Sequence, residues 1–319
     1  MVKSISKILL SALSLAILCF TLGCNIDLPG LFASNDLDER LLEKDNFKYL
    51  KPEERNFKIA VRDPSDPALP NPDPMDPYKY SFIIMTDTHV EDGDITDLKK
   101  IENEIKGDVR FLANLGDISQ YGSEQDITAV LNFYRTLTIP CYPVVGNHDI
   151  YSHNGVCNWP VWQKYIGSTR YRVNGEINSY RVTGPNEAVD REVVHTECFT
   201  LLVLDSANAF IGKSQVDWLE KELKTAKGAV FVMTHSDLFV QDKIKIQQLY
   251  DPAERARIMT LLRDNNDKCK MMLMGHSHEW VKKEFGDVVY ISIDDYKSTQ
   301  KFLLVTVKNG EVSYVLKQL

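Results

Sequence analysis

Short apolar runs recur along the chain from residue 80 onward, and polar residues follow each of them. The first five runs are Phe82–Thr86, Val109–Gly116, Ile139–Val145, Ala229–Thr234 and Met271–Gly275. Apolar runs of this length, bounded by turn-forming residues, predict strands that are buried within a sheet. Three later runs have no helical pattern between them and predict a second, more antiparallel sheet: Val288–Ile293, Lys301–Val307 and Val312–Leu316.

Helical patterns separate several of the predicted strands. They cover Ser123–Leu137, Ser214–Leu223 and Pro252–Arg263. In the second of these, Ser214 is the expected N-cap residue, and Val216, Leu219 and Leu223 lie on one face. Strands that alternate with helices predict an α/β fold in which the helices lie outside the sheets.

The first 23 residues have the pattern of an export signal. Two lysines precede an apolar stretch, Ile8–Phe20, that is too short to span a membrane comfortably. The segment Thr21–Cys24 resembles a bacterial lipobox, although leucine is usual at the position of Thr21. This resemblance implies that Cys24 is lipidated and that the protein is a membrane-anchored lipoprotein of the bacterial cell envelope, on the periplasmic or surface side. An ordinary cleaved signal or an uncleaved anchor is the alternative.

Residues 24–79 are expected to form a lipid-anchored spacer that is rich in Asp and Pro. Six prolines lie between Asp63 and Pro77, and such a run favours extended polyproline geometry over a place in a sheet. An arm wrapped around the domain is the alternative. The folded domain is therefore expected over residues 80–319.

The composition is that of a globular protein that is long enough to bury a large core. Of its 319 residues, 44% are hydrophobic and 26% are charged, and the formal net charge is −8. No cluster of Lys and Arg is long enough to follow a phosphate backbone, so a nucleic-acid-binding surface is not expected. The cysteines have no C-x-x-C spacing, and Cys141 and Cys269 are expected to be small core residues. The sequence specifies no oligomeric state.

Polar residues with metal-binding or catalytic chemistry gather directly after the five predicted strands. They are Asp87, His89, Asp117, Asn147, His148, Asp149, His235, His276 and His278. Because the carboxyl ends of parallel strands meet at one edge of a sheet, these side chains are expected to converge. Taken alone, Gly146–Asp149 has the composition of an ordinary Asx-type turn, but five of the seven histidines lie at these ends.

The ordered pattern of D-x-H, G-D, G-N-H-D, a lone His and G-H-x-H resembles the calcineurin-like metallophosphoesterase superfamily. The resemblance extends from about Tyr80 to the end of the chain. It implies a two-sheet α/β/β/α sandwich and a metallophosphoesterase catalytic domain over residues 80–319. It also implies a metal-dependent hydrolase that acts on phosphate esters with a dinuclear centre.

Carried over residue by residue, the resemblance fills every ligand position for two divalent ions. One ion would be held by Asp87, His89 and His278, the other by Asn147, His235 and His276, and Asp117 would bridge them. Carboxylate and imidazole ligands suit Mn, Fe, Zn or Ni. Two such ions can clamp a phosphoryl group and generate hydroxide from bound water near neutral pH.

Two residues of the third motif have no ligand role in the family pattern. His148 is expected to face the phosphate and to protonate the leaving oxygen, and Asp149 is expected to orient the His148 ring.

Departures from other branches of the superfamily favour a phosphodiesterase. Gly116–Gly122 lacks the Arg of the Ser/Thr phosphatase motif G-D-x-x-D-R-G, and Gln120 stands where purple acid phosphatases place a Tyr. Asp87–His89 together with Gly146–Asp149 looks more like the bacterial phosphodiesterase branch, so phosphodiesters are the expected substrates. A phosphomonoesterase or nucleotidase using the same site is one alternative. A non-catalytic binding lipoprotein on the same fold is another.

Overall fold

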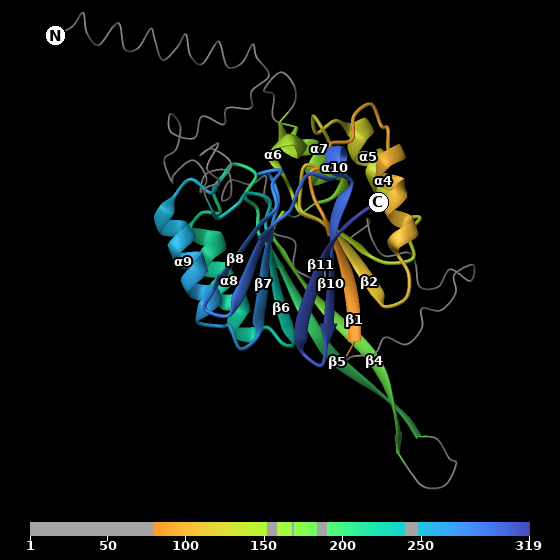
Figure 1. Cartoon of the computed structure of the whole chain (residues 1–319), viewed down its shortest axis with the longest axis vertical. Helices are drawn as coiled ribbons and strands as arrows, with labels where there is room; N and C mark the ends of the chain where they lie inside the picture. The colour runs from red at the N-terminus through yellow and green to blue at the C-terminus, as the bar shows by residue number, and fades with distance from the viewer. Residues whose placement is uncertain (1–78, 152–157, 168, 184–189, 240–247) are drawn as a thin grey trace, which may run out of the picture.

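The computed structural model describes residues 79–151, 158–167, 169–183, 190–239 and 248–319, without the side chains of residues 176–197. The predicted signal, the Cys24 lipidation site and the spacer up to residue 78 lie outside the described residues. Two sheets stack face to face in the middle of the molecule, and helices cover both outer faces (Figure 1). This arrangement is the predicted α/β/β/α sandwich.

The first sheet has five strands in the order β11-β10-β1-β2-β3. They are β1 (Lys79–Met85), β2 (Val109–Asn114), β3 (Cys141–Pro143), β10 (Lys301–Lys308) and β11 (Glu311–Gln318). The three strands β1, β2 and β3 are parallel, so their carboxyl ends lie at the same edge. β10 and β11 pair antiparallel on the other side of β1.

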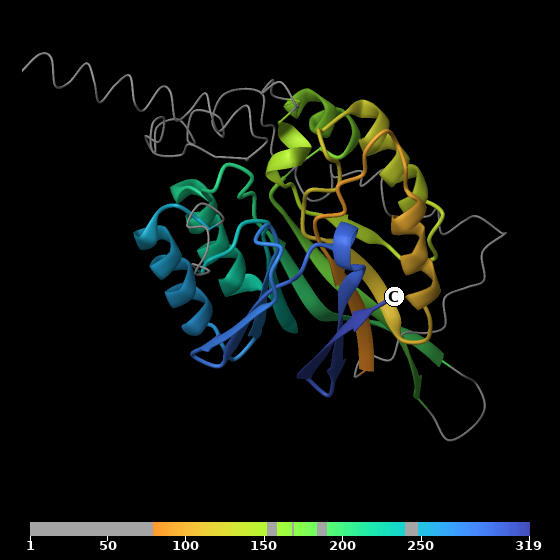
Figure 2. The ribbon, with the colours of Figure 1, turned by 45° about the horizontal axis from the view of Figure 1, so that its top comes forward.

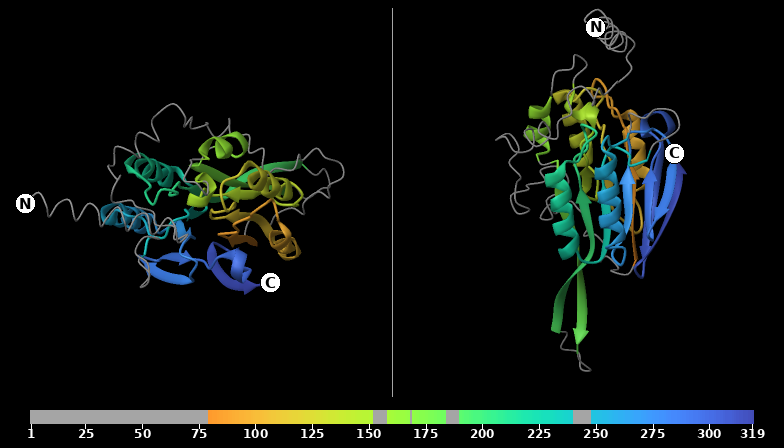
Figure 3. Two further views of the ribbon diagram at one scale, coloured as in Figure 1. Left: turned by 90° about the horizontal axis from the view of Figure 1, so that it is seen from above. Right: turned by 90° about the vertical axis from the view of Figure 1, so that its left-hand side faces the viewer.

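The second sheet has six strands in the order β4-β5-β6-β7-β9-β8. They are β4 (Tyr171–Thr183), β5 (Asp190–Val203), β6 (Ala229–Met233), β7 (Cys269–Met274), β8 (Val281–Phe285) and β9 (Val288–Ser292). β5, β6, β7 and β9 are parallel. β4 and β5 form a long ribbon that extends beyond the sandwich (Figure 3).

The prediction that the last three strands together form a second, more antiparallel sheet is wrong. β9 is parallel to β7 in the six-stranded sheet, whereas β10 and β11 join the five-stranded sheet beside β1. A short helix, α10 (Tyr296–Thr299), carries the chain from one sheet to the other. A four-residue helix has too little periodicity to be seen in the sequence.

Alternating side chains of the buried strands divide the interior into three apolar layers. In β1, Tyr80, Phe82 and Ile84 point into the layer between the sheets, whereas Ile83 and Met85 point into an outer layer. Phe82 stacks on Phe111 of β2 and meets the ring of Phe231 of β6 edge-on. Successive side chains of a strand point to opposite faces of the sheet. Because both faces of each sheet meet apolar neighbours, the strands appear in the sequence as continuous apolar runs.

Helices close each outer layer, as Figure 2 shows from a tilted view. α4 (Thr96–Lys99), the 3-10 helix η2 (Lys100–Glu104), α5 (Glu124–Tyr134) and α7 (Trp159–Tyr165) pack on the five-stranded sheet. α8 (Lys213–Thr225) and α9 (Pro252–Arg263) pack on the six-stranded sheet. Within the described ranges, no helix has both the length and the apolar character needed to cross a bilayer.

The helix predictions hold closely, with one wrong cap. α9 has the predicted bounds, and Ser123 caps α5 by accepting a hydrogen bond from the Asp126 amide. α8 begins one residue before Ser214, with Gly212 at the N-cap. The amides of Ile211 and Gly212 donate to the Glu254 carboxylate of α9, so α9 fixes the chain where α8 begins.

Candidate metal centre

The five strand ends converge between the two sheets, as the sequence predicts. Asp87 follows β1, Asp117 follows β2 and the short helix α6 (Asn147–Ile150) follows β3. His235 follows β6, and His276 and His278 follow β7, so the second sheet brings three histidines to the same place.

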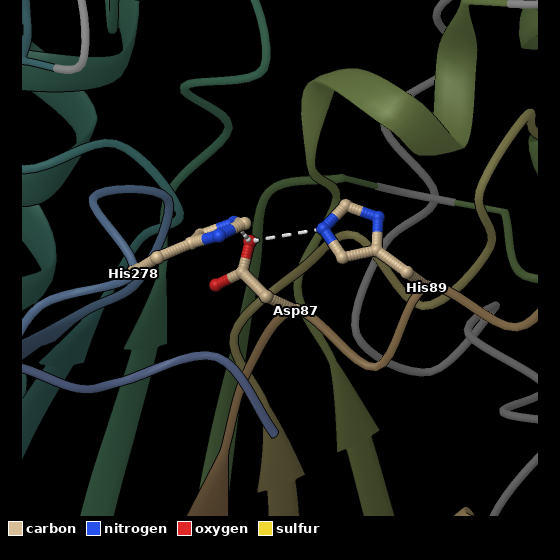
Figure 4. Close-up of side chains that lie close together, drawn as sticks. All are labelled: Asp87, His89 and His278. Carbon is tan, nitrogen blue, oxygen red and sulfur yellow. Dashed lines mark hydrogen bonds and ion pairs between the residues drawn. The ribbon is translucent and has the colours of Figure 1, made fainter. Parts of the chain in front are cut away.

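One group consists of Asp87, His89 and His278, with the two imidazole rings close to the Asp87 carboxylate (Figure 4). Its Oδ1 atom lies 3.2 Å from Nε2 of His278 and 3.7 Å from Nε2 of His89. Asp87 is fully buried, whereas the side chain of His278 is 44% exposed. The group therefore has one face in the interior and one face toward solvent.

A second group forms around His235. Its Nε2 atom lies 3.1 Å from Oδ1 of Asn147, 3.1 Å from Nδ1 of His276 and 3.3 Å from Oδ2 of Asp117. The same Oδ2 atom lies 3.8 Å from Nε2 of His89. Asp117 therefore lies between the two groups, in the position of a bridging ligand.

The chemistry of these donors fits divalent cations. One nitrogen of His235 faces three lone-pair atoms, and a single N–H cannot satisfy them all. Both ring nitrogens of His89 are buried without a hydrogen-bond partner among the described residues. Buried polar atoms without a partner are costly in a metal-free interior, and a cation between Asp87, His89 and Asp117 would satisfy the Nε2 atom, which faces both carboxylates.

Backbone hydrogen bonds fix which nitrogen of His235 faces the centre. Its Nδ1 atom lies 2.9 Å from the carbonyl oxygen of Leu115, so Nδ1 carries the proton and Nε2 is left to bind. The Asp87 carboxylate is held in a similar way, because its Oδ2 atom accepts hydrogen bonds from the Thr86 hydroxyl and the His276 amide.

The glycines of these motifs are needed because side chains pass close to them. A Cβ atom on Gly146 would lie 2.1 Å from Oδ1 of Asp117, and one on Gly275 would lie 2.0 Å from the Thr86 hydroxyl oxygen. Contacts this short cannot be accommodated, so only glycine allows Asp117 and Asp87 to take their positions.

Five of the candidate ligands have a left-handed backbone. Their φ angles lie between 41° and 66°, at Asp87, His89, Asp117, His276 and His278. This region is unfavourable for residues other than glycine, and it persists where surrounding contacts enforce it. Such strain is typical of functional sites, and here it turns each side chain from a strand end toward the centre.

His148 lies at the edge of the centre, but Asp149 does not orient its ring. Nδ1 of His148 lies 2.8 Å from the Gln120 carbonyl oxygen. The two Asp149 oxygens accept hydrogen bonds from the amides of Ser119 and Gly146 instead. The expectation for Asp149 is therefore corrected: its buried carboxylate fixes the two motif loops to each other, and the Gln120 carbonyl holds the imidazole.

His148 also lies close to two candidate ligands. Its ring meets the His89 ring edge-on at 4.7 Å between centroids, and its amide donates a hydrogen bond to Oδ1 of Asp117. The three residues form a further group that could hold a cation. The geometry thus allows a ligand role for His148 beside the acid role that the sequence predicts.

Burial and neighbouring charges shift the pKa values of the centre in opposite directions. Burial alone would lower the pKa of His235, but the carboxylates of Asp117 and Asp87 raise it to about 10. Burial, aided by the nearby His235, lowers the pKa of His276 to about 3. His276 is therefore neutral and ready to bind, whereas His235 must lose a proton before a cation can bind.

Comparison with known proteins agrees with this geometry. Residues 80–280 match the model of the calcineurin-like phosphoesterase family. The chain belongs to this family. The chain is a phosphoric ester hydrolase of a family that uses divalent metals, and the residue groups described above could hold such an ion. A search of curated protein sequences gave no match.

Solved structures share the phosphoesterase fold at low sequence identity. Purple acid phosphatase PPD1 from yellow lupin is 11% identical with a TM-score of 0.56, and the match covers 78% of this chain and 52% of that protein. GAP50, described as the anchor in the inner membrane complex of Plasmodium, is 15% identical with a TM-score of 0.51, and the match covers 75% and 84%. The chain spans about half the length of the lupin phosphatase. At these identities the likeness concerns the fold alone.

Two residues that support the phosphoesterase centre could not be recognised in the sequence. One is Gln120, which acts through its carbonyl oxygen. The other is Lys297, whose Nζ atom lies 3.0 Å from the carbonyl oxygen of His89. Neither belongs to a motif, because any residue has a backbone carbonyl and an isolated lysine carries no sequence signal.

Proposed function

We propose that the protein hydrolyses phosphodiesters with two divalent metal ions. The observation that carries the proposal is the position of Asp117. Its Oδ2 atom lies 3.3 Å from Nε2 of His235 and 3.8 Å from Nε2 of His89, between the two ligand groups. A carboxylate that faces both groups is the ligand that two ions would share.

The seven ligands have different parts in this proposal. Asp87, His89 and His278 would hold one ion, and Asn147, His235 and His276 the other. When bound, the two ions would polarise the phosphoryl group and lower the pKa of a coordinated water. Of these ligands only Asp87 and Asp117 are anionic, so the loaded centre keeps a positive charge that binds a phosphate ester.

His148 would act on the leaving group. The Gln120 carbonyl accepts the Nδ1 proton, so the proton for the leaving oxygen would come from Nε2 of the doubly protonated imidazolium ring. The His148 amide also donates to Oδ1 of Asp117, which ties the acid to the bridging ligand. Asp149 acts at a distance, because it holds Gly146 and Ser119 in place.

One argument supports diesters over monoesters. The motifs Asp87–His89 and Gly146–Asp149 look like those of the bacterial phosphodiesterases. A phosphomonoesterase or nucleotidase remains the second candidate, because purple acid phosphatase PPD1 shares the fold.

A substrate panel distinguishes these candidates. Chelator-treated protein should lose hydrolysis, and Mn²⁺, Fe²⁺, Zn²⁺ or Ni²⁺ should restore it. Turnover of bis(4-nitrophenyl) phosphate well above that of 4-nitrophenyl phosphate supports the diesterase. The reverse order supports the monoesterase. Metal binding without turnover of either would support a binding protein, the role that the GAP50 description as an anchor illustrates for this fold.

We also propose that the catalytic domain is anchored through a lipid on Cys24, with residues 24–79 as its spacer. The proposal is supported by the lipobox-like stretch Thr21–Cys24 and by the six prolines between Asp63 and Pro77. Cys24→Ser should move the protein from the membrane fraction to a soluble or unprocessed form. A correctly cleaved Cys24→Ser protein that stays in the membrane fraction would contradict it.

A further inference from the structure

Helix α10 lies directly against the turn that carries the first two candidate ligands. The Tyr296 amide donates to the Thr86 carbonyl at 3.0 Å, and the Lys297 amide donates to the Asp87 carbonyl at 3.2 Å. The Lys297 side chain then reaches over the turn, and its Nζ atom lies 3.0 Å from the His89 carbonyl oxygen. Lys297 thus donates to the Asp87 carbonyl through its backbone amide and to the His89 carbonyl through its side chain.

These contacts lie at residues whose backbone conformation is unfavourable. Asp87 and His89 both have left-handed φ angles, 52° and 41°. A non-glycine residue in this region costs about 1–3 kcal/mol and stays there only when neighbouring contacts enforce it. Lys297 supplies such contacts at both residues, and its ammonium also lies 3.7 Å from Glu91, just beyond the turn.

Helix α10 is itself held in place by a cap and by a buried side chain. Asp295 caps the helix by accepting a hydrogen bond from the Ser298 amide, and Tyr296 is buried at 1% exposure. The Tyr296 hydroxyl donates to the Asp97 carbonyl in the helical layer. The backbone of residue 297 is therefore fixed, and the lysine side chain is held at the centre although 43% of it is exposed.

We propose that Lys297 is a positioning residue for the metal ion held by Asp87, His89 and His278. Its ammonium fixes the His89 carbonyl, and this contact keeps the His89 imidazole turned toward Asp87. Lys297 itself lies outside the ligand set, because its ammonium is directed to a carbonyl and a carboxylate. The inference rests on the metal centre of the proposed function.

Stepwise Mn²⁺ binding to the full protein tests the role. His278→Ala and His235→Ala, each lacking one ligand of one group, identify which binding step belongs to which group. Lys297→Met removes the donor at similar length, and it should weaken the step that His278→Ala weakens by about 10- to 100-fold, the usual effect of losing a ligand's supporting contact. The step that His235→Ala weakens should be unchanged.

Two further variants serve as controls. Lys301→Met removes a lysine just after α10 that pairs with Asp294 at 2.8 Å instead of the turn, and it should bind Mn²⁺ as the unaltered protein does. Lys297→Arg keeps a donor at the same position and should restore much of the lost affinity. If Lys297→Met does not fold, Lys297→Gln is titrated in its place, because its shorter side chain cannot reach the His89 carbonyl.

The outcomes separate this inference from the proposed function. Unchanged Mn²⁺ affinity in Lys297→Met, equal weakening of both steps, or the same loss in Lys301→Met would overturn the role of Lys297. Absence of Mn²⁺ binding in the unaltered protein would instead overturn the metal centre itself.

Discussion

Oδ2 of Asp117 and Nε2 of His235 lie 3.3 Å apart, although the two residues belong to loops of different sheets. Asp117 follows β2 of the five-stranded sheet, and His235 follows β6 of the six-stranded sheet. Their contact links the two halves of the sandwich at the centre, and Asp117, which also faces His89, is the residue whose change should affect both ligand groups.

Asp117→Asn should lose metal and turnover together. The amide keeps an oxygen for the His148 amide, so the fold should persist, but the charge shared between the ions is removed. Turnover should fall on the order of 10³-fold, with fewer metal ions per chain by elemental analysis. Asp126→Asn is the matched control, because Asp126 is a buried carboxylate that bonds to Ser119 and Gly93 outside the ligand set. Normal metal content in Asp117→Asn would exclude the bridging role.

His148→Asn should separate catalysis from metal binding. Metal content should stay near normal, while turnover should fall by about 10²–10⁴-fold, the range for a positioned acid. The loss should be greatest for alkyl esters, whose leaving oxygens need a proton, and smallest for nitrophenyl esters. Loss of a metal ion, or equal slowing of both ester types, would show that His148 is a ligand or a structural group.

Metal uptake should become stronger as the pH rises. In the metal-free protein the pKa of His235 is raised to about 10, so at neutral pH an incoming ion must displace its proton. Calorimetry in buffers of different ionisation enthalpy should detect about one released proton per chain, with the ion of the group that contains His235. His235→Asn should abolish that release, and an unaltered proton count in this variant would place the titrating group elsewhere.

The same shift has a consequence for the stability of the metal-free protein. A raised folded-state pKa stabilises the fold fully below the ordinary value of 6.5, and this contribution disappears as the pH rises through about 10. Metal-free protein should therefore show a thermal midpoint that decreases between these pH values. His235→Asn should flatten this part of the profile.

Gly146→Ala should weaken the metal centre, although it adds only one methyl group. The new methyl group would lie 2.1 Å from Oδ1 of Asp117, so the carboxylate must move. We expect a stability loss of about 1–3 kcal/mol together with weaker metal binding. Gly310→Ala is the control: its φ of 82° makes alanine costly, but nothing lies within 4 Å. It should lower the unfolding temperature and leave metal affinity intact.

The motif side chains were predictable because their positions in the chain fix their positions in the fold. Each follows a buried strand directly, and parallel strands bring their carboxyl ends together, so Asp87, Asp117 and Asn147 had to meet. The composition of Gly146–Asp149 also indicated a turn. The neighbour that makes glycine necessary there, Asp117, needed the structure.

Sheet membership and supporting contacts could not be predicted in the same way. An apolar run such as Val288–Ser292 specifies burial, but tertiary pairing decides which sheet takes it. The ribbon of β4 and β5 extends past the sandwich, so its outer part lacks the alternating pattern of a half-buried strand. The Gln120 and Lys297 contacts use backbone carbonyls as acceptors, and the sequence contains no signal for an acceptor that every residue has.

The ligands are spread along most of the domain, from Asp87 after the first strand to His278 after β7. During synthesis, a growing chain that ends before β7 has only part of either ligand group, and the second sheet is still missing a central strand. A cation that needs a complete ligand group would therefore bind only after β7 and the loop that follows it have been made. The supply of metal would then determine how much of the finished protein is active.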